Sequence, residues 1–235
     1  LAPLIFVSTL LTHVGGGSAG REGTAVQMGG GIGGGVSTLL RLVPVDRRSV
    51  LLAGMAAGFG AVFGTPMAAA IFAIECIQPR RLDWRALPAC LIAAWTAHWT
   101  CLACGGSHAS YDVGLPPFSR LRWEDLHFGW LLGSCVAGLA AGGIARLYIQ
   151  VGKLTARGFS RIPQPWLRPA LGAGFVILLV TVLRDRSYLG LGALPMDPGG
   201  VSIETAFGPA GIPPWAWILK LVFTVVTLGS GFKGG

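Results

Sequence analysis

Charged residues are scarce in this 235-residue chain, and the scarcity excludes two large classes of protein. Asp, Glu, Lys and Arg together make up 12% of the residues, whereas a soluble domain usually carries about 25%. So few charges cannot coat a soluble protein of this length with polar surface. Hydrophobic residues make up 52% and the mean hydropathy is +0.64, so intrinsic disorder is excluded as well.

Cysteines are few, and their number is odd. There are five, and Cys76, Cys90, Cys101 and Cys135 lie in apolar stretches, which argues against the disulfide framework of a secreted protein. Cys101 and Cys104 form a single CxxC with no second pair or nearby ligand cluster. We therefore interpret them as small packing residues and expect neither a metal nor another cofactor.

The net charge of +8 is spread over short clusters between long uncharged runs. A nucleic-acid surface has a continuous basic patch, so no nucleic-acid partner is expected. Glycine is abundant, at 37 residues against a usual share of about 7%, and it lacks the collagen period. Together these features predict an all-α protein in a lipid bilayer, with helices that pack through small residues.

Candidates for membrane-embedded helices are the uncharged windows 1–20, 23–40, 49–74, 86–111, 126–145, 169–183 and 205–219. A spanning helix needs about 20 apolar residues, which the windows from Ser49, Ala86 and Leu126 supply. Glycine and proline interrupt several windows, at Gly15-Gly16-Gly17, at Gly29 to Gly35 and at Gly64-Thr65-Pro66. Interrupted segments of this kind are typical of the discontinuous helices of transporters.

The glycines between Gly29 and Gly35 allow two interpretations. Gly29, Gly31 and Gly34 spell the GxGxxG of dinucleotide-binding folds, but that motif must follow a strand in a soluble βαβ unit. The same residues form overlapping GxxxG steps, which let a neighbouring helix approach closely in a membrane. We favour the packing interpretation.

Loop charges predict an orientation. Basic loops at 80–85 and 153–161 are separated by two windows, with a loop of mixed charge at 108–125 between the windows. Two spans return the chain to the same side, so the positive-inside rule places both basic loops in the cytoplasm of a cell (inner or plasma) membrane. Cysteine labelling that found positions 81 and 157 on opposite faces would contradict this prediction.

The most informative segment is Gly20-Arg21-Glu22-Gly23-Thr24. Ionisable residues between membrane-embedded segments are candidates for function, although a water-facing loop at a helix end is the alternative. A helix beginning near Thr24 would offer free N–H groups to an anion, and the glycines would let the backbone approach it. Glu22 would compete with that anion and withdraw when protonated. Thr24 either donates its hydroxyl to the anion or caps the helix.

Residues Gly20–Gly23, followed by Val26-Gln27, resemble the G-[RK]-E-G-P motif of the CLC family of chloride channels and anion/proton antiporters. Two further segments, 56–75 and 219–235, resemble that family's motifs in the right order. Thr24 replaces the family's proline, and Phe232-Lys233 stands within the last glycine motif. Both departures are similar to the branch of CLC-type fluoride/proton antiporters.

The resemblance implies a polytopic helical bundle with broken helices and inverted repeats. Residues 1–125 would form most of the first repeat and residues 126–235 the truncated opening of the second, in a homodimer. The chain starts at Leu1 and stops at Gly235 within a glycine motif, so we expect it to be a piece of a longer protein. The implied function is fluoride export coupled to proton influx; a chloride channel or chloride/proton antiporter is the alternative.

The resemblance also assigns roles to individual residues. Glu22 is the implied proton-coupled gate, and Gly20, Arg21, Gly23 and Thr24 surround the anion. Further candidates are Ser230 and Lys233 on the pathway, although Lys233 is equally a snorkelling lysine. Glu75 is a candidate for the proton route; the family's internal glutamate often follows this position, where this chain has Cys76.

An intramembrane serine hydrolase is a third and different hypothesis. Gly16-Gly17-Ser18-Ala19-Gly20 fits GxSxG, with His13 nearby and His98 as a conceivable partner on another helix. A nucleophile elbow, however, needs a strand before its serine, and an apolar helix is predicted there. We therefore expect a transporter with no catalytic residues.

Overall fold

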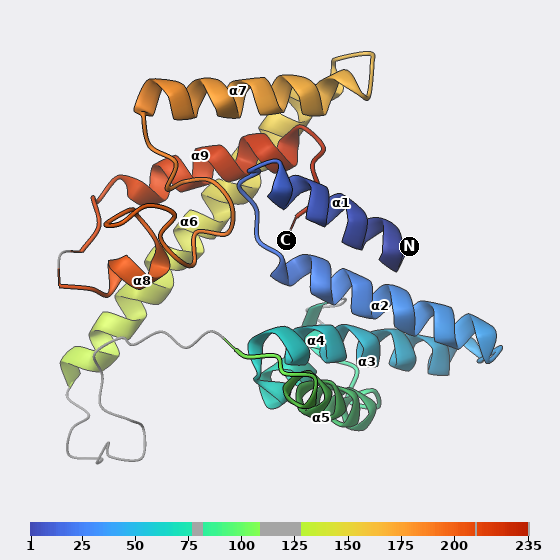
Figure 1. The fold of residues 1–235 in the computed structure, drawn as a ribbon. Helices are drawn as coiled ribbons and strands as arrows, with labels where there is room; N and C mark the ends of the chain where they lie inside the picture. Colours follow the sequence, from blue (N-terminus) through green and yellow to red (C-terminus); the bar gives the residue numbers. More distant parts are fainter. Residues whose placement is uncertain (77–81, 109–127, 210, 235) are drawn as a thin grey trace. The chain divides into compact units, whose positions relative to one another are not determined.

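The computed structural model describes residues 1–76, 82–108, 128–209 and 211–234, which form helices and connecting segments without a strand (Figure 1). Positions 80, 81 and 109–125, on which the orientation prediction partly depends, lie outside these residues. The chain divides into two compact units, Leu1–Gly15 with Ala19–Ser110 and Lys233–Gly235, and Gly16–Ser18 with Tyr111–Phe232. An all-helical fold, as the composition predicts, is confirmed.

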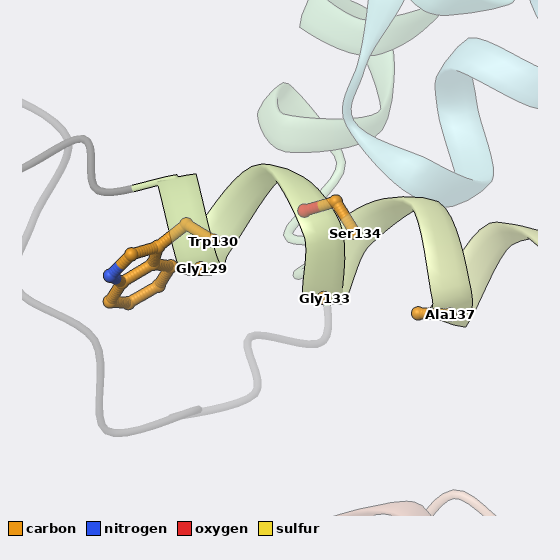
Figure 2. Close-up of a pocket in the computed structure, with 5 residues that line it drawn as sticks. All are labelled: Gly129, Trp130, Gly133, Ser134 and Ala137. Carbon is orange, nitrogen blue, oxygen red and sulfur yellow. The ribbon is translucent and has the colours of Figure 1, made fainter.

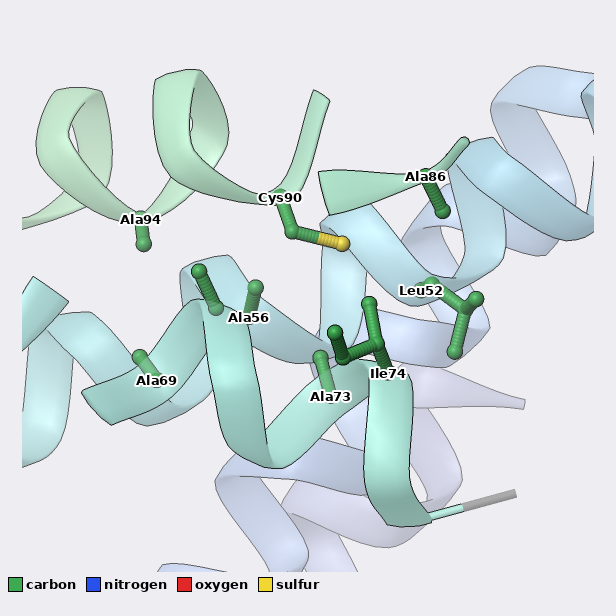
Figure 3. Packing of buried hydrophobic residues seen from close by; sticks show 9 residues of the cluster. Leu52, Ala56, Ala69, Ala73, Ile74, Ala86, Cys90 and Ala94 are labelled. Carbon is green, nitrogen blue, oxygen red and sulfur yellow. The ribbon is translucent and has the colours of Figure 1, made fainter. Parts of the chain in front are cut away.

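The first unit is built around α3 (Pro44–Phe63), which packs against α2 (Glu22–Leu39), α4 (Pro66–Cys76) and α5 (Leu87–Ala103); α1 (Ala2–Val14) packs against α2 (Figure 1). Small side chains fill the core between α3, α4 and α5, as Figure 3 shows for Ala56, Ala73 and Ala94. Because alanines keep the backbones close, these helices pack at short range.

The predicted interruption at Gly64-Thr65-Pro66 is confirmed. Gly64 ends α3 with a left-handed φ of 68°, a conformation that costs other residues energy. Pro66 then begins α4, where its missing N–H is harmless. The window from Ser49 is therefore two helices rather than one spanning helix.

Glycines between Gly29 and Gly35 do not break α2, which runs through all of them. They let α3 approach: a Cβ on Gly29 would collide with the carbonyl oxygen of Gly54, and one on Gly33 would lie 2.5 Å from the carbonyl oxygen of Val50. The GxxxG interpretation is thereby confirmed. The physical reason is that an isolated helix is weakened by glycine, whereas close packing compensates for it.

This packing makes a testable contrast between two glycines of α2. We expect Gly33→Ala to lower the free energy of unfolding by about 1–3 kcal/mol, because a backbone carbonyl must move to admit the methyl group. A Cβ on Gly34 would have nothing within 4 Å, so Gly34→Ala should be neutral or stabilising by up to about 1 kcal/mol. Unfolding of the full-length protein in detergent measures both; equal effects would contradict the packing.

In the second unit, α9 (Ala216–Gly229) packs against α6 (Phe128–Ser160) and α7 (Leu167–Leu183), while α8 (Ile203–Ala206) is a single turn (Figure 1). The aromatic pair Tyr188 and Phe223 is buried in its core. The uncharged window 205–219 is interrupted, as its glycines and prolines predict. Pro213 and Pro214 lie within it, and a helix begins only after them, at Ala216.

Among the described residues, α6 alone is both long and apolar enough to cross a membrane, with 33 residues. Several shorter apolar helices accompany it, including α5, whose window was expected to be long enough to span. No described residue of α6 is buried. At its first turns, Gly129, Gly133 and Ala137 leave an open hollow of about 560 Å³ beside Trp130 and Ser134 (Figure 2).

Candidate functional site

Glu22 is the first residue of α2, and its carboxylate lies against the helix's own N-terminus. The backbone N–H of Arg21, the N-cap residue, donates to Glu22 Oε2 at 2.8 Å. Glu22 and Gly23 are half-buried, whereas the Arg21 side chain is exposed. The carboxylate therefore takes up an amide donor at a position where the helix dipole favours negative charge.

Hydrogen bonding within α2 starts with the N–H of Ala25, which donates to the carbonyl oxygen of Arg21 at 3.1 Å. The amides before Ala25 precede this ladder, as they do at any helix start. Such amides can bind an anion. Protonation of Glu22 would weaken the hydrogen bond that its carboxylate accepts from the Arg21 amide. The arrangement can thus exchange a carboxylate for a free anion.

Thr24 does not cap this helix. The helix begins at Glu22, two residues earlier than predicted, so Thr24 lies inside its first turn. Thr24 is buried, and its hydroxyl donates to the carbonyl oxygen of Arg21 at 2.6 Å. The physical reason for the correction is that a cap must accept from free amides, whereas this hydroxyl is a donor.

The other predicted residues occupy different elements. Glu75 is exposed at the end of α4, one residue before Cys76. Ser230 is buried at the C-cap of α9 and donates to the carbonyl oxygen of Thr227 at 2.9 Å. Lys233 is exposed in the irregular segment that follows.

Ser18 belongs to a group of hydroxyls that the sequence did not reveal; Ser18 and Thr227 are buried, and Thr224 is half-buried. The N–H of Ser18 donates to Thr227 Oγ1 at 3.2 Å, and its hydroxyl lies 3.0 Å from Thr224 Oγ1. Both threonines are on α9. The signal was a polar stripe in an apolar helix, since Lys220, Thr224 and Thr227 follow one another at spacings of four and three residues and share a face.

The predicted hydrolase residues have other partners in the described part of the chain. Ser18 pairs with threonine, while His13 Nδ1 lies 2.9 Å from the carbonyl oxygen of Thr9. His98 is stacked on His108, with ring centroids 5.2 Å apart.

A family model described as voltage gated chloride channel matches residues 1–235. The chain belongs to this family, the CLC family. CLC proteins are integral membrane proteins that act as anion transporters or channels, and the helical fold with broken segments described above is of the CLC type.

Similar proteins include both branches of this family. A chloride/fluoride channel protein of Pseudomonas syringae pv. tomato is 35% identical over 100% of this chain and 50% of its own length. The H(+)/Cl(-) exchange transporter ClcA of Vibrio campbellii is 27% identical over 92% of this chain and 45% of its own. The crystal structure of a CLC-type fluoride/proton antiporter matches 99% of this chain and 55% of its own, with a TM-score of 0.85 and 36% identity. This chain thus spans about half the length of these relatives.

Proposed function

We propose that the full-length CLC protein exports fluoride in exchange for protons, with Glu22 as the gate that both ions move. The observation that carries this proposal is the Glu22 carboxylate on the Arg21 amide, at the N-terminus of α2. The relatives named for fluoride, at 35% and 36% identity, support the choice of anion. Thr24 and Lys233, which depart from the chloride motifs, support it as well.

The exchange follows from the competition for amides. Ionised Glu22 holds the Arg21 N–H and closes the site to other anions. Protonated Glu22 is a weaker acceptor, so it leaves and fluoride takes the amides around Gly20, Arg21 and Gly23. Departure of the anion lets the carboxylate return and release its proton. Because fluoride is strongly hydrated, such a site must replace its water with close N–H or hydroxyl donors.

Efflux from liposomes holding the full-length protein tests this function. We expect fluoride efflux to exceed chloride efflux by at least about tenfold, since a site shaped for a small ligand rejects a slightly larger one by roughly 10- to 200-fold. Proton uptake should accompany the fluoride. Chloride efflux equal to or faster than fluoride efflux would assign the protein to the chloride channel or chloride/proton antiporter branch instead.

Lys233 is proposed to attract anions to the pathway from its exposed position after α9. Lys233→Gln should slow fluoride efflux by about two- to tenfold at low ionic strength, and the difference should shrink in 1 M salt, where the Debye length is about 3 Å. Efflux rates over a salt series measure this. A snorkelling lysine predicts no salt-dependent difference between the variant and the wild type.

The remaining sequence predictions stay proposals for the whole protein. We propose a homodimer, inverted repeats that divide near residue 125, and cytoplasmic basic loops in the cell (inner or plasma) membrane. Ser230 is proposed to lie on the pathway, and Glu75 to contribute to a proton route. Light scattering of the purified protein tests the dimer, and labelling at positions 81 and 157 tests the orientation.

A further inference from the structure

We propose that Thr224 and Thr227 of α9 are positioning residues for the gate: they clamp Ser18, from which the chain continues to Glu22. This inference rests on the proposed function, because it gives the clamp a gate to position. The clamp is defined by Ser18, Thr224 and Thr227. It joins segments that are 206 and 209 residues apart in the sequence.

Burial makes the clamp specific. The Ser18 and Thr227 side chains are 0% and 1% exposed, so water cannot replace their hydrogen bonds. A buried polar group that loses its partner carries the full cost of its desolvation. The backbone N–H of Ser18 depends on Thr227 in this way, since Thr227 Oγ1 is its acceptor.

The donor and acceptor roles of the three hydroxyls in the clamp are fixed by their other hydrogen bonds. Thr227 Oγ1 donates to the carbonyl oxygen of Phe223 at 2.8 Å, and Thr224 Oγ1 donates to that of Lys220 at 2.8 Å. A hydroxyl has one hydrogen, so both threonines are left to act as acceptors towards Ser18. Ser18 therefore donates twice, through its N–H to Thr227 and through its hydroxyl to Thr224.

The same face of α9 holds a second connecting segment. Lys220 Nζ donates to the carbonyl oxygens of Tyr188 and Gly190 at 3.2 and 2.7 Å. Tyr188 is buried against Phe223, with ring centroids 5.7 Å apart. The polar stripe of α9 thus anchors chain segments on a helix that is itself packed in a core, and so offers a rigid support.

The link from clamp to gate is the chain itself. Ala19, Gly20 and Arg21 connect Ser18 to Glu22, so the Cα atom of Glu22 lies within roughly 14 Å of that of Ser18 at full extension. Gly17 and Ala19 are buried beside the clamped residue. Releasing Ser18 would let this short connection shift, and with it the Arg21 amide that the Glu22 carboxylate must reach.

The test uses the full-length protein in liposomes, with fluoride efflux and proton uptake recorded together. Thr227→Val keeps the shape of the side chain and removes the acceptor, so the number of protons taken up per fluoride should fall at least about fivefold. Thr227→Ser retains the hydroxyl and should stay within about twofold of the wild type. The matched control is Thr181→Val on α7, whose hydroxyl donates only to Ile177 in the described residues; it should also stay within about twofold.

A Glu22→Gln background separates positioning from general damage. There, Thr227→Val should change fluoride efflux by less than about twofold, because no gate carboxylate is left to position. If Thr227→Val slowed fluoride efflux equally in the wild-type and Glu22→Gln backgrounds, the proposal would be overturned. Equal falls in protons taken up per fluoride in Thr227→Ser and Thr227→Val would overturn it as well. Wild-type coupling in Thr227→Val would overturn it too.

Hydrogen–deuterium exchange gives a readout that does not depend on transport. Thr227→Val, or Thr224→Val if the first variant does not assemble, should speed exchange of the peptide 16–22 by at least about fivefold, and Thr181→Val should not. Unchanged exchange would overturn the clamp. If the wild type shows no coupled fluoride flux but the variants show this difference in exchange, the proposed function is contradicted and the clamp on Ser18 still stands.

Discussion

Glu22→Gln should abolish proton uptake while leaving the fold intact. Glutamine cannot bind and release the transported proton, so we expect proton uptake by liposomes to fall at least about 100-fold, to the level of empty vesicles. The amide is close in size to the carboxylate and can still accept the Arg21 N–H. However, it carries no charge, and charge-assisted hydrogen bonds are roughly twice as strong as neutral ones.

Glu204→Gln is the matched control for this substitution. Glu204 also lies in the first turn of a helix, α8, and is exposed. Its replacement should leave fluoride efflux and proton uptake within about twofold of the wild type. Proton uptake that persists in Glu22→Gln would refute Glu22 as the coupled residue, and Glu75 would become the first candidate to test in its place.

Gly64→Ala should be among the most destabilising substitutions in the first unit. Gly64 has a left-handed φ of 68°, and a Cβ there would lie 2.5 Å from the ring of His108. We expect a loss of about 3 kcal/mol in the free energy of unfolding, from a left-handed penalty of roughly 1–2 kcal/mol and a steric penalty of about 1–3 kcal/mol. Since α4 starts immediately afterwards, fluoride efflux per folded molecule should fall as well.

Gly105→Ala separates the two causes. Gly105 is also left-handed, at 79°, but nothing lies within 4 Å of its Cβ position, so only the backbone penalty of roughly 1–2 kcal/mol applies. Thermal or chemical unfolding of the full-length protein in detergent measures both variants. Equal losses would show that the contact with His108 contributes nothing, and losses below about 0.5 kcal/mol would contradict the left-handed turns themselves.

Local sequence chemistry predicted the features that depend on neighbouring residues. The break at Gly64-Thr65-Pro66 could be predicted because a left-handed glycine and an N-terminal proline act on their own peptide units, and the structure confirms it. The close approach of α2 and α3 could be predicted because Gly29 and Gly33 have no side chains, whatever residues surround them, and the structure confirms it. The family followed from motifs of the same local kind, such as Gly20–Gly23.

Other features were decided by tertiary structure. Helix propensity and charge could not show that α2 starts at Glu22, with Thr24 donating within its first turn rather than capping it. Within the window 205–219, the lack of charge could not show that α9 starts at Ala216. Ser18 is hydrogen-bonded to Thr224 and Thr227, which are more than 200 residues away in the sequence. Only the packing of α9 brings these partners together. The sequence shows that a residue carries a hydroxyl group, but the partner of that hydroxyl depends on where the folded chain places it.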